Sequence, residues 1–248
     1  DLLGIDVGTS GVKTGIFDSA GRLLGLGRSG YRPETPRPGW AESDPAQWWA
    51  GLRESLAVAC RDAEISPEDI AGIGVSVMFP VVVALDADAR PLYPGILYSD
   101  QRSIEQVRKI ERAVPPETWQ TVTGNVLVPG TCAVSSMAWL RDKRPEAYRK
   151  AHVIGFANTF ITARLTGRFC TDPTMVALSG LADIRDPWRW SAELCREVGI
   201  DYERLPEVIG SAEVVGGVNE SAAAELGLKA GTPVVCGAGD TPLGAVGA

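Results

Sequence analysis

The amino-acid sequence predicts an α/β domain built around a mixed sheet. Short apolar runs joined by glycine-containing turns open the chain and predict two successive β-hairpins over residues 2–28. A stretch with apolar residues at helical spacing follows over 45–63, and two more strand-like runs come after it. The predicted order is therefore three strands, a helix, further strands and a mostly helical segment from about 99 to 154. This order is typical of a sheet with helices packed against it.

Local signals justify the elements in turn. Three prolines place residues 31–43 in a loop, and Asp44-Pro45 supplies an N-cap and a first-turn proline for the helix over 45–63. Ser99 is expected to cap a helix over 100–113. The other predictions are strands at 2–7, 12–17, 22–28, 70–77, 81–86 and 232–236, a helical turn at 66–67, helices through 139–140, over 158–166 before Gly167 and over 219–226, and a loop-rich region around Asp172-Pro173 and Asp186-Pro187.

Composition narrows the class of protein. The 248 residues carry a net charge of −7 without a Lys/Arg run, which argues against nucleic acid as the main partner. The single histidine, His152, makes a zinc site with two histidine ligands impossible and is expected to be structural. Five cysteines without C-x-x-C spacing argue against a disulfide framework, and we find no signal peptide and no bilayer-spanning run. We therefore expect a cytoplasmic protein without a membrane partner.

Two segments share one design, an apolar strand followed by a glycine-rich turn that carries an aspartate. The first is Ile5–Gly11, with Asp6 and the nearby Lys13, and the second is Val234–Thr241, with Asp240. Backbone N–H groups in such turns can hold phosphate oxygens, and an aspartate at a strand end can bind Mg²⁺ or accept a proton. The simpler interpretation of the first segment is a hairpin turn with Asp6 as a solvated strand-end residue, and spacing alone leaves both open.

Several motifs in a fixed order resemble one protein family. Leu3–Asp18 (LGIDVGTSGVKTGIFD) is similar to the opening phosphate-loop motif of the FGGY carbohydrate kinases. Further matches follow in that family's order: Gly39–Glu42 with Asp44-Pro45 and Trp48-Trp49, Leu85–Arg102, Leu165–Gly167 with Thr171-Asp172, and Gly231–Asp240. The resemblance covers essentially the whole chain and is greatest to the xylulokinase-like members of the family.

The resemblance implies a fold and an activity. The fold would be an actin-like ATPase (ribonuclease-H-like) domain, with a mixed sheet flanked by helices and a helical insertion. Residues 1–248 would be the N-terminal, sugar-binding domain, because the chain stops just after the motif of the catalytic aspartate. The C-terminal nucleotide-binding domain would then be absent from this chain, and we expect the isolated domain to be inactive. The activity implied is ATP-dependent phosphorylation of a sugar or polyol hydroxyl.

The resemblance also implies roles for individual residues. Asp240 would be the catalytic base, and Asp6 would help to place Mg²⁺, the metal cofactor used with ATP. The residues implied to face the ATP phosphates are Gly8, Thr9, Ser10 and Lys13. Those implied to contact the sugar are Met78, Phe79, Asp100, Arg102 and Thr241. A simpler interpretation of Asp100 and Arg102 is a helix cap and a surface ion pair, whereas Trp40 could stack on a sugar or anchor its loop.

Two departures from the family pattern bear on the substrate. Where xylulokinase-like members usually have Gln-Met-His-Gly, this sequence has Val77-Met78-Phe79-Pro80, and Thr241 stands where Asn or Gln is common. The loss of two polar side chains predicts that xylulose is not the best substrate. Two other functions stay open, namely a non-catalytic sugar-binding or regulatory module and an actin-like ATPase that acts on no sugar. The sequence also leaves a homodimer open.

Overall fold

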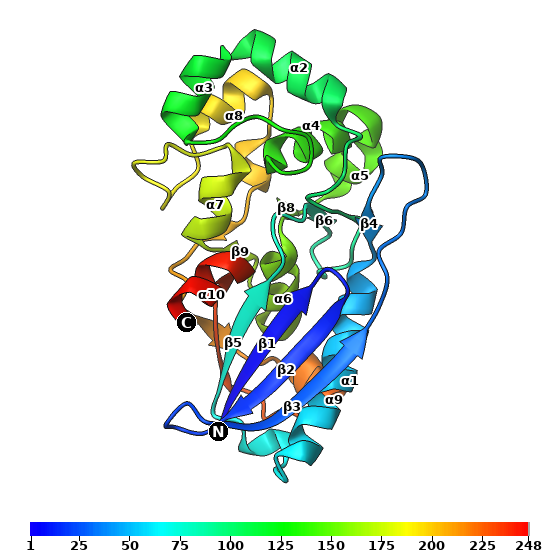
Figure 1. The fold of residues 1–248 in the computed structure, drawn as a ribbon, viewed down its shortest axis with the longest axis vertical. Coiled ribbons are helices and arrows are strands. Elements are labelled where there is room, and N and C mark those ends of the chain that lie inside the picture. The colour runs from blue at the N-terminus through cyan, green and yellow to red at the C-terminus, as the bar shows by residue number, and fades with distance from the viewer. Residues whose placement is uncertain (248) are drawn as a thin grey trace.

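A seven-stranded mixed sheet forms the lower half of the molecule, and a lobe of helices lies above it (Figure 1). The structure, a computed structural model, describes residues 1–247. The strands of the sheet are β1 (Leu2–Gly8), β2 (Gly11–Phe17), β3 (Leu23–Gly30), β5 (Gly72–Val77), β11 (Val214–Gly217), β12 (Pro233–Val235) and β13 (Ala238–Gly239). Their order is β11-β12-β5-β1-β2-β3, and β13 also pairs with β5.

The directions of the strands confirm the predicted mixed sheet. Strands β1, β12 and β13 run parallel to β5, whereas β2 is antiparallel to both β1 and β3. Side chains of β1 alternate between a buried face, with Leu3, Ile5 and Val7, and a half-buried face, with Gly4 and Asp6. This period of two places the apolar side chains against helices and leaves the polar ones on the opposite face.

Helix α1 (Pro45–Asp62) packs against the buried face of β2 and β3, as its apolar spacing predicts. Asp44 caps the helix by accepting a hydrogen bond from the Ala46 amide at 2.9 Å. The helix and strand approach very closely at Gly27, where a Cβ would lie 1.8 Å from the Ser55 carbonyl oxygen. Helices α6 (Ala157–Thr166) and α9 (Glu220–Leu226) contact α1 and lie in the same layer.

The helical lobe confirms the predicted insertion. Its helices are α2 (Ile104–Ala113), α3 (Pro116–Thr123), α4 (Ala133–Lys143), α5 (Pro145–Lys150), α7 (Pro173–Ser179) and α8 (Ala192–Val198). Three small strand pairs connect it with the sheet domain, β4 (Glu42–Ser43) with β7 (Gly95–Ile96), β6 (Val83–Leu85) with β8 (Val153–Gly155), and β9 (Cys170–Thr171) with β10 (Glu207–Val208). The remaining elements are the 3₁₀ turns η1 (Pro67–Asp69) and η2 (Tyr202–Arg204) and helix α10 (Asp240–Gly247).

Three details differ from the sequence-based expectation. Helix α2 begins at Ile104 and not at residue 100, because the Asp100 carboxylate instead binds the backbone amides of Ala41 and Arg102, at 2.6 and 2.8 Å. The region around Asp172-Pro173 and Asp186-Pro187, expected to be rich in loops, contains α7 and α8, and residues 153–155 form a strand.

Within residues 1–247, no helix combines the length and apolar character that crossing a bilayer requires.

Candidate active site

The carboxyl ends of three neighbouring parallel strands, β1, β5 and β13, meet at one edge of the sheet. Asp6 on β1 is level with Ser76 on β5, and Ser76 is level with Ala238 on β13. Because adjacent strands are spaced about 4.8 Å apart, Asp6 and Ala238 lie about 10 Å apart across the sheet. Three of the segments that the sequence singles out continue these strands, namely the turn at 8–11, the loop at 78–80 and the start of α10 at 240–241.

The loop after β1 is a two-residue hairpin turn. Thr9 and Ser10 form the turn between the paired Gly8 and Gly11, so the simpler interpretation of this segment gives its backbone shape correctly. Tyr31 holds the turn through two hydrogen bonds. Its amide donates to the Ser10 carbonyl at 3.0 Å, and its hydroxyl donates to the Gly8 carbonyl. Burial and the nearby Asp6 carboxylate raise the pKa of Tyr31, so the phenol keeps the proton that it donates.

Asp6 and Lys13 point to the face of the sheet opposite α1, from paired positions on β1 and β2. The Asp6 carboxylate lies 3.4 Å from the Lys13 ammonium and accepts a hydrogen bond from the Ser76 hydroxyl at 3.2 Å. Both charged side chains line a cavity of about 520 Å³, together with Ser76 and Gly237. A carboxylate and an ammonium that line one cavity can bind a phosphate together with its metal ion.

The side chains around Asp6 suit Mg²⁺, which keeps water and phosphate ligands, better than they suit a metal ion whose ligands are all protein side chains. Among residues 1–247, no three His, Cys, Asp or Glu side chains gather as they would around a protein-bound metal. Mg²⁺ is usually bound by one or two carboxylates, with water and substrate phosphates as its other ligands. A single carboxylate, 35% exposed at the cavity, meets that requirement.

The loop after β5 places its two predicted sugar contacts differently. Met78 is buried, and its amide donates to the Val7 carbonyl at 2.7 Å. Phe79 is half-buried and lies against β13, where a Cβ on Gly239 would be 3.2 Å from the ring. Phe79 therefore reaches the strand that leads into Asp240, whereas the Met78 side chain lies in the core.

Asp240 is the exposed first residue of α10. Its carboxylate accepts a hydrogen bond from the Thr241 amide at 2.8 Å, and the Thr241 hydroxyl lies at 3.4 Å. The turn before it needs glycine at position 237, where φ is +74° and a Cβ would lie 2.0 Å from the Val75 carbonyl oxygen. A rigid, tight turn thus presents a solvated carboxylate at the strand edge, a suitable position for a proton acceptor.

Asp100 and Arg102 lie in a different place, a buried charge cluster with Glu42 at the base of the helical lobe. The Arg102 guanidinium contacts the Asp100 carboxylate at 2.7 Å and the Glu42 carboxylate at 2.5 Å. Burial acts to lower the pKa of Arg102, but the bonds to these carboxylates outweigh it and raise the pKa. The expected surface ion pair is therefore a buried one, and Asp100 does not cap α2.

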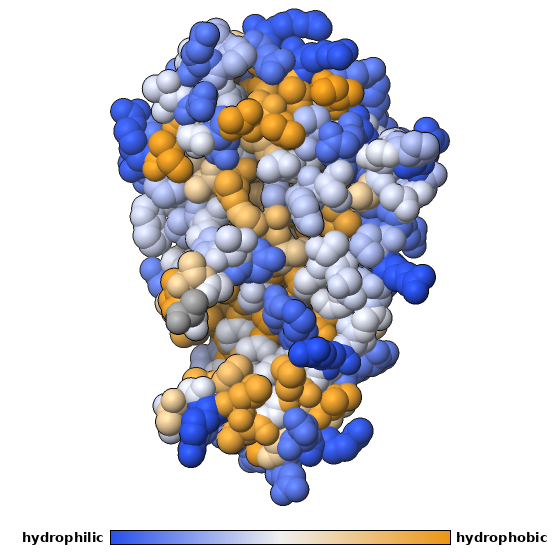
Figure 2. Space-filling view, in the orientation of Figure 1, coloured by the Kyte–Doolittle hydropathy of each residue, from blue (hydrophilic) through white to orange (hydrophobic). Residues whose placement is uncertain are grey.

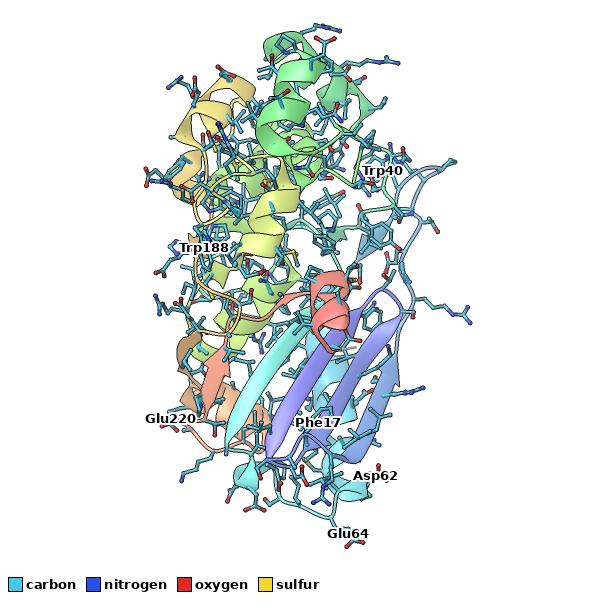
Figure 3. The ribbon with its side chains drawn as sticks, turned by 60° about the vertical axis from the view of Figure 1, so that its left-hand side comes forward. Phe17, Trp40, Asp62, Glu64, Trp188 and Glu220 are labelled. Carbon is cyan, nitrogen blue, oxygen red and sulfur yellow. The ribbon has the colours of Figure 1, made fainter. Side chains whose placement is uncertain are left out.

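Trp40 anchors its loop through this charge cluster. The guanidinium carbon of Arg102 lies 3.7 Å from the centre of the Trp40 ring and 4.9 Å from that of Trp139. Figure 3 shows Trp40 where the loop that precedes β4 meets the helical lobe. The anchoring role, one of the two expected for Trp40, agrees with these contacts.

Sequence reasoning missed Ser76 and Tyr31. Ser76 is the polar residue in an otherwise apolar, alternating strand (GIGVSV), and that pattern could have indicated a side chain on the open face. Tyr31 has no comparable signal, because its contact with Gly8 depends on how residues 31–43 return across the sheet. A cavity of about 860 Å³, larger than the one at Asp6, is lined by Arg149, His152 and Tyr202 and includes none of the predicted site residues.

Figure 2 shows the surface of the sheet side of the molecule. Apolar side chains gather over the lower part of the sheet, where Leu2, Leu24 and Leu26 are exposed. The carboxyl ends of the parallel strands lie farther up, next to the helical lobe (Figure 1). The candidate site is thus at the junction of the sheet and the lobe, where two layers of different structure meet.

A mixed sheet of this order, with one aspartate near the carboxyl end of β1 and another directly after β13, is the actin-like ATPase fold, and solved structures of sugar kinases share it. A xylulose kinase from Rhodospirillum rubrum superimposes with a TM-score of 0.92 and 28% identity over 99% of this chain and 50% of that kinase. The chain belongs to the FGGY family of carbohydrate kinases, whose N-terminal domain model matches residues 2–247.

Curated relatives support the same assignment. The L-xylulose/3-keto-L-gulonate kinase of Escherichia coli (strain K12) is 34% identical over 243 residues, which are 95% of this chain and 47% of that kinase. A glycerol kinase of Thermococcus gammatolerans is 33% identical over 221 residues, 87% of this chain and 44% of that kinase. The chain spans about half the length of the curated relatives that it matches.

Proposed function

We propose that this chain is the sugar-binding half of a kinase that transfers a phosphoryl group from ATP to a hydroxyl of a sugar or polyol. The main support is the meeting of Asp6, the hairpin turn at 8–11 and Asp240 at one strand edge in a member of the FGGY family. Residues 1–248 would act with a C-terminal nucleotide-binding domain, since the matching relatives are about twice as long. Five buried free thiols fit a cytoplasmic location, where thiols stay reduced.

The proposed chemistry divides the site between a proton acceptor and a phosphate-binding part. Asp240 would accept the proton of the attacking hydroxyl, a task for which a carboxylate suffices because phosphoryl transfer depends mainly on positioning and charge neutralisation. The hairpin turn with Thr9 and Ser10 would face the phosphate through its backbone amides and hydroxyls. Lys13 would supply positive charge there, and Asp6 would help to hold Mg²⁺. Mg²⁺, when bound, neutralises negative charge on the phosphates.

The sugar side of the proposal rests on Phe79 and Thr241. Both flank Asp240 in the structure, Phe79 through its contact with Gly239 and Thr241 as the next residue. Met78, Asp100 and Arg102 are buried, so a sugar could reach them only if the surrounding loops moved. We propose that the sugar packs an apolar face on Phe79 and that its hydroxyls bind elsewhere in the site.

A substrate panel tests this function. The protein from the complete reading frame is expected to release ADP with at least one ketose or polyol, and to prefer another substrate to xylulose. Phe79 and Val77 cannot hydrogen-bond to a sugar hydroxyl, and a site that lacks such partners discriminates against the ligand that needs them. The measurement is kcat/KM over pentuloses, hexuloses and polyols.

The control for this panel is the 248-residue chain alone, which should show no sugar-dependent ADP release. A preference for xylulose across the panel would contradict the proposed specificity. Sugar-dependent turnover by the isolated chain would contradict the division of labour between two domains. No sugar-dependent rate with any substrate would favour an ATPase without a sugar or a non-catalytic module.

Replacing Asp6 by Asn is expected to weaken the response of the enzyme to Mg²⁺. The Mg²⁺ concentration for half-maximal rate should rise about tenfold or more, because the substitution removes the charge that faces the metal. The measurement is initial rate against Mg²⁺ concentration at saturating ATP and sugar. Asp88→Asn, at an exposed carboxylate in another loop, is the matched control and should leave the curve unchanged. An unchanged curve for Asp6→Asn would exclude the metal role.

A further inference from the structure

The buried carboxylate of Asp172 lies beneath the segment that leads into Asp240, the first residue of α10. Asp172 is fully buried and is the N-cap of α7, which packs beside β13. Its carboxylate accepts hydrogen bonds from the Thr174 amide at 2.9 Å, the Ser211 hydroxyl at 3.0 Å and the Asn158 amide group at 3.4 Å. Burial raises the pKa of Asp172, and the bonds from Thr174 and Ser211 counter only part of that effect.

Two of these partners also hold the turn before Asp240. The Ser211 carbonyl accepts a hydrogen bond from the Gly237 amide at 2.9 Å. The Thr174 hydroxyl accepts one from the Gly239 amide at 3.3 Å. Gly237 lies in the turn between β12 and β13, and Gly239 is the last residue of β13. Asp172 therefore reaches both the turn and the residue before Asp240, each through one intermediate residue.

Capping alone does not require this arrangement. A serine caps a helix as well as an aspartate does, and it would not place a carboxylate in the interior, where a carboxylate costs free energy unless it is hydrogen-bonded. Asp172 is bound instead by groups from three elements, the start of α7, the start of α6 and the loop that contains Ser211. Two of these groups, from Thr174 and Ser211, belong to residues that also bind the segment leading to Asp240.

We propose that Asp172 is a positioning residue for phosphoryl transfer, which sets the place of the Asp240 carboxylate through Thr174 and Ser211. The inference rests on the proposed function of Asp240 as the base. A general base must lie within hydrogen-bonding distance of the proton that it accepts. A displacement of about 1 Å can lower the rate about 10²-fold, so two bonds that fix the preceding turn bear directly on kcat.

Thr174 offers the sharpest test, because it permits a matched pair of variants. Thr174→Val keeps the shape of the side chain but removes the hydroxyl that binds the Gly239 amide, whereas Thr174→Ser keeps the hydroxyl. In the protein from the complete reading frame we expect Thr174→Val to lower kcat about tenfold, with the KM for the sugar within about twofold of wild type. Thr174→Ser should recover most of kcat. Asp172→Asn, which presents an NH₂ group to the same donors, should lower kcat at least as much.

Hydrogen exchange gives a second measurement that does not depend on activity. The Gly239 amide should exchange about tenfold faster in Thr174→Val than in wild type or Thr174→Ser, while core amides such as that of Ile73 keep their protection. This comparison separates a local effect on the turn from general destabilisation. Equal exchange at Gly239 in all three proteins would overturn the proposal.

The kinetic outcomes distinguish the inference from the function on which it rests. Wild-type kcat in Thr174→Val, or an equal loss in Thr174→Val and Thr174→Ser, would overturn the positioning role. A rise in KM without a fall in kcat would overturn it as well, since that pattern belongs to binding. If Asp240→Asn keeps the wild-type rate, the proposed base is wrong. If only Asp240→Asn is impaired, the base stands and the role of Asp172 falls.

Discussion

Asp240→Asn is expected to lower kcat for sugar phosphorylation by about 10²–10⁴-fold, the usual effect of removing a general base. Asparagine has nearly the same size and still accepts a hydrogen bond from the Thr241 amide, but it cannot take a proton. The turn before it, fixed by Gly237, should therefore keep its shape. Rates are measured with the best sugar of the panel in the protein from the complete reading frame.

Sugar affinity separates the loss of a base from the loss of a binding site. Calorimetry should show sugar binding within a few-fold of wild type for Asp240→Asn, because the substitution removes a proton acceptor and leaves Phe79 and Thr241 in place. Asp88→Asn serves as the matched control and should keep the wild-type rate. A rate for Asp240→Asn within a few-fold of wild type would remove Asp240 from its proposed role, and a comparable loss of sugar affinity would make it a binding residue.

Sequence patterns predict the sheet well because its strands alternate or are continuously apolar between glycine-rich turns. The same patterns locate the turns at 8–11 and 237–240, since a glycine with a positive φ or no room for a Cβ leaves a visible mark in the sequence. Which of these turns meet in space follows only from the order of the strands. The resemblance to a known family predicts the mixed sheet, which the structure confirms, and the order of its strands comes from the structure.

Residues 172–180 show where reading of local signals failed. Asp44-Pro45 and Asp172-Pro173 are the same dipeptide, and both begin a helix in the structure, with the aspartate as N-cap and the proline in the first turn. The sequence predicts a loop-rich region around the second, because the seven residues of α7 are too few to show a helical period. A capping signal is therefore informative even where periodicity is weak.

Met78 and Arg102 show why candidate site residues are harder to predict than strands. Val77 is buried, so strict alternation would turn Met78 outward, but the strand ends there and the chain bends so that both side chains are buried. Arg102 forms an ion pair with Glu42, which is 60 positions away in the sequence. A local sequence pattern cannot show that two residues so far apart in the sequence are in contact. From the sequence alone, Arg102 and Glu42 therefore look like ordinary surface charges.

Arg102→Ala is expected to lower the free energy of unfolding by about 3–5 kcal/mol, the usual cost of removing one partner of a buried ion pair. The side chain of Arg102 is 1% exposed, and its removal leaves the carboxylates of Asp100 and Glu42, at 0% and 8% exposure, without their cation. The Trp40 and Trp139 rings would also lose the guanidinium that packs against them. Urea unfolding of the 248-residue chain, followed by tryptophan fluorescence, measures the change.

Arg90→Ala is the matched control, because Arg90 pairs with Asp88 on the surface, where both side chains are about two-thirds exposed or more. An exposed pair contributes about 0–1 kcal/mol, so this variant should unfold almost as wild type does. A loss for Arg102→Ala no larger than that for Arg90→Ala would contradict the buried-pair interpretation.

If the cluster instead contacts the sugar, Arg102→Lys should keep stability and lose sugar affinity. If the cluster fixes the loop of Trp40, Arg102→Lys should lose stability, because lysine cannot bridge two carboxylates while it also packs on the Trp40 ring as a planar guanidinium does.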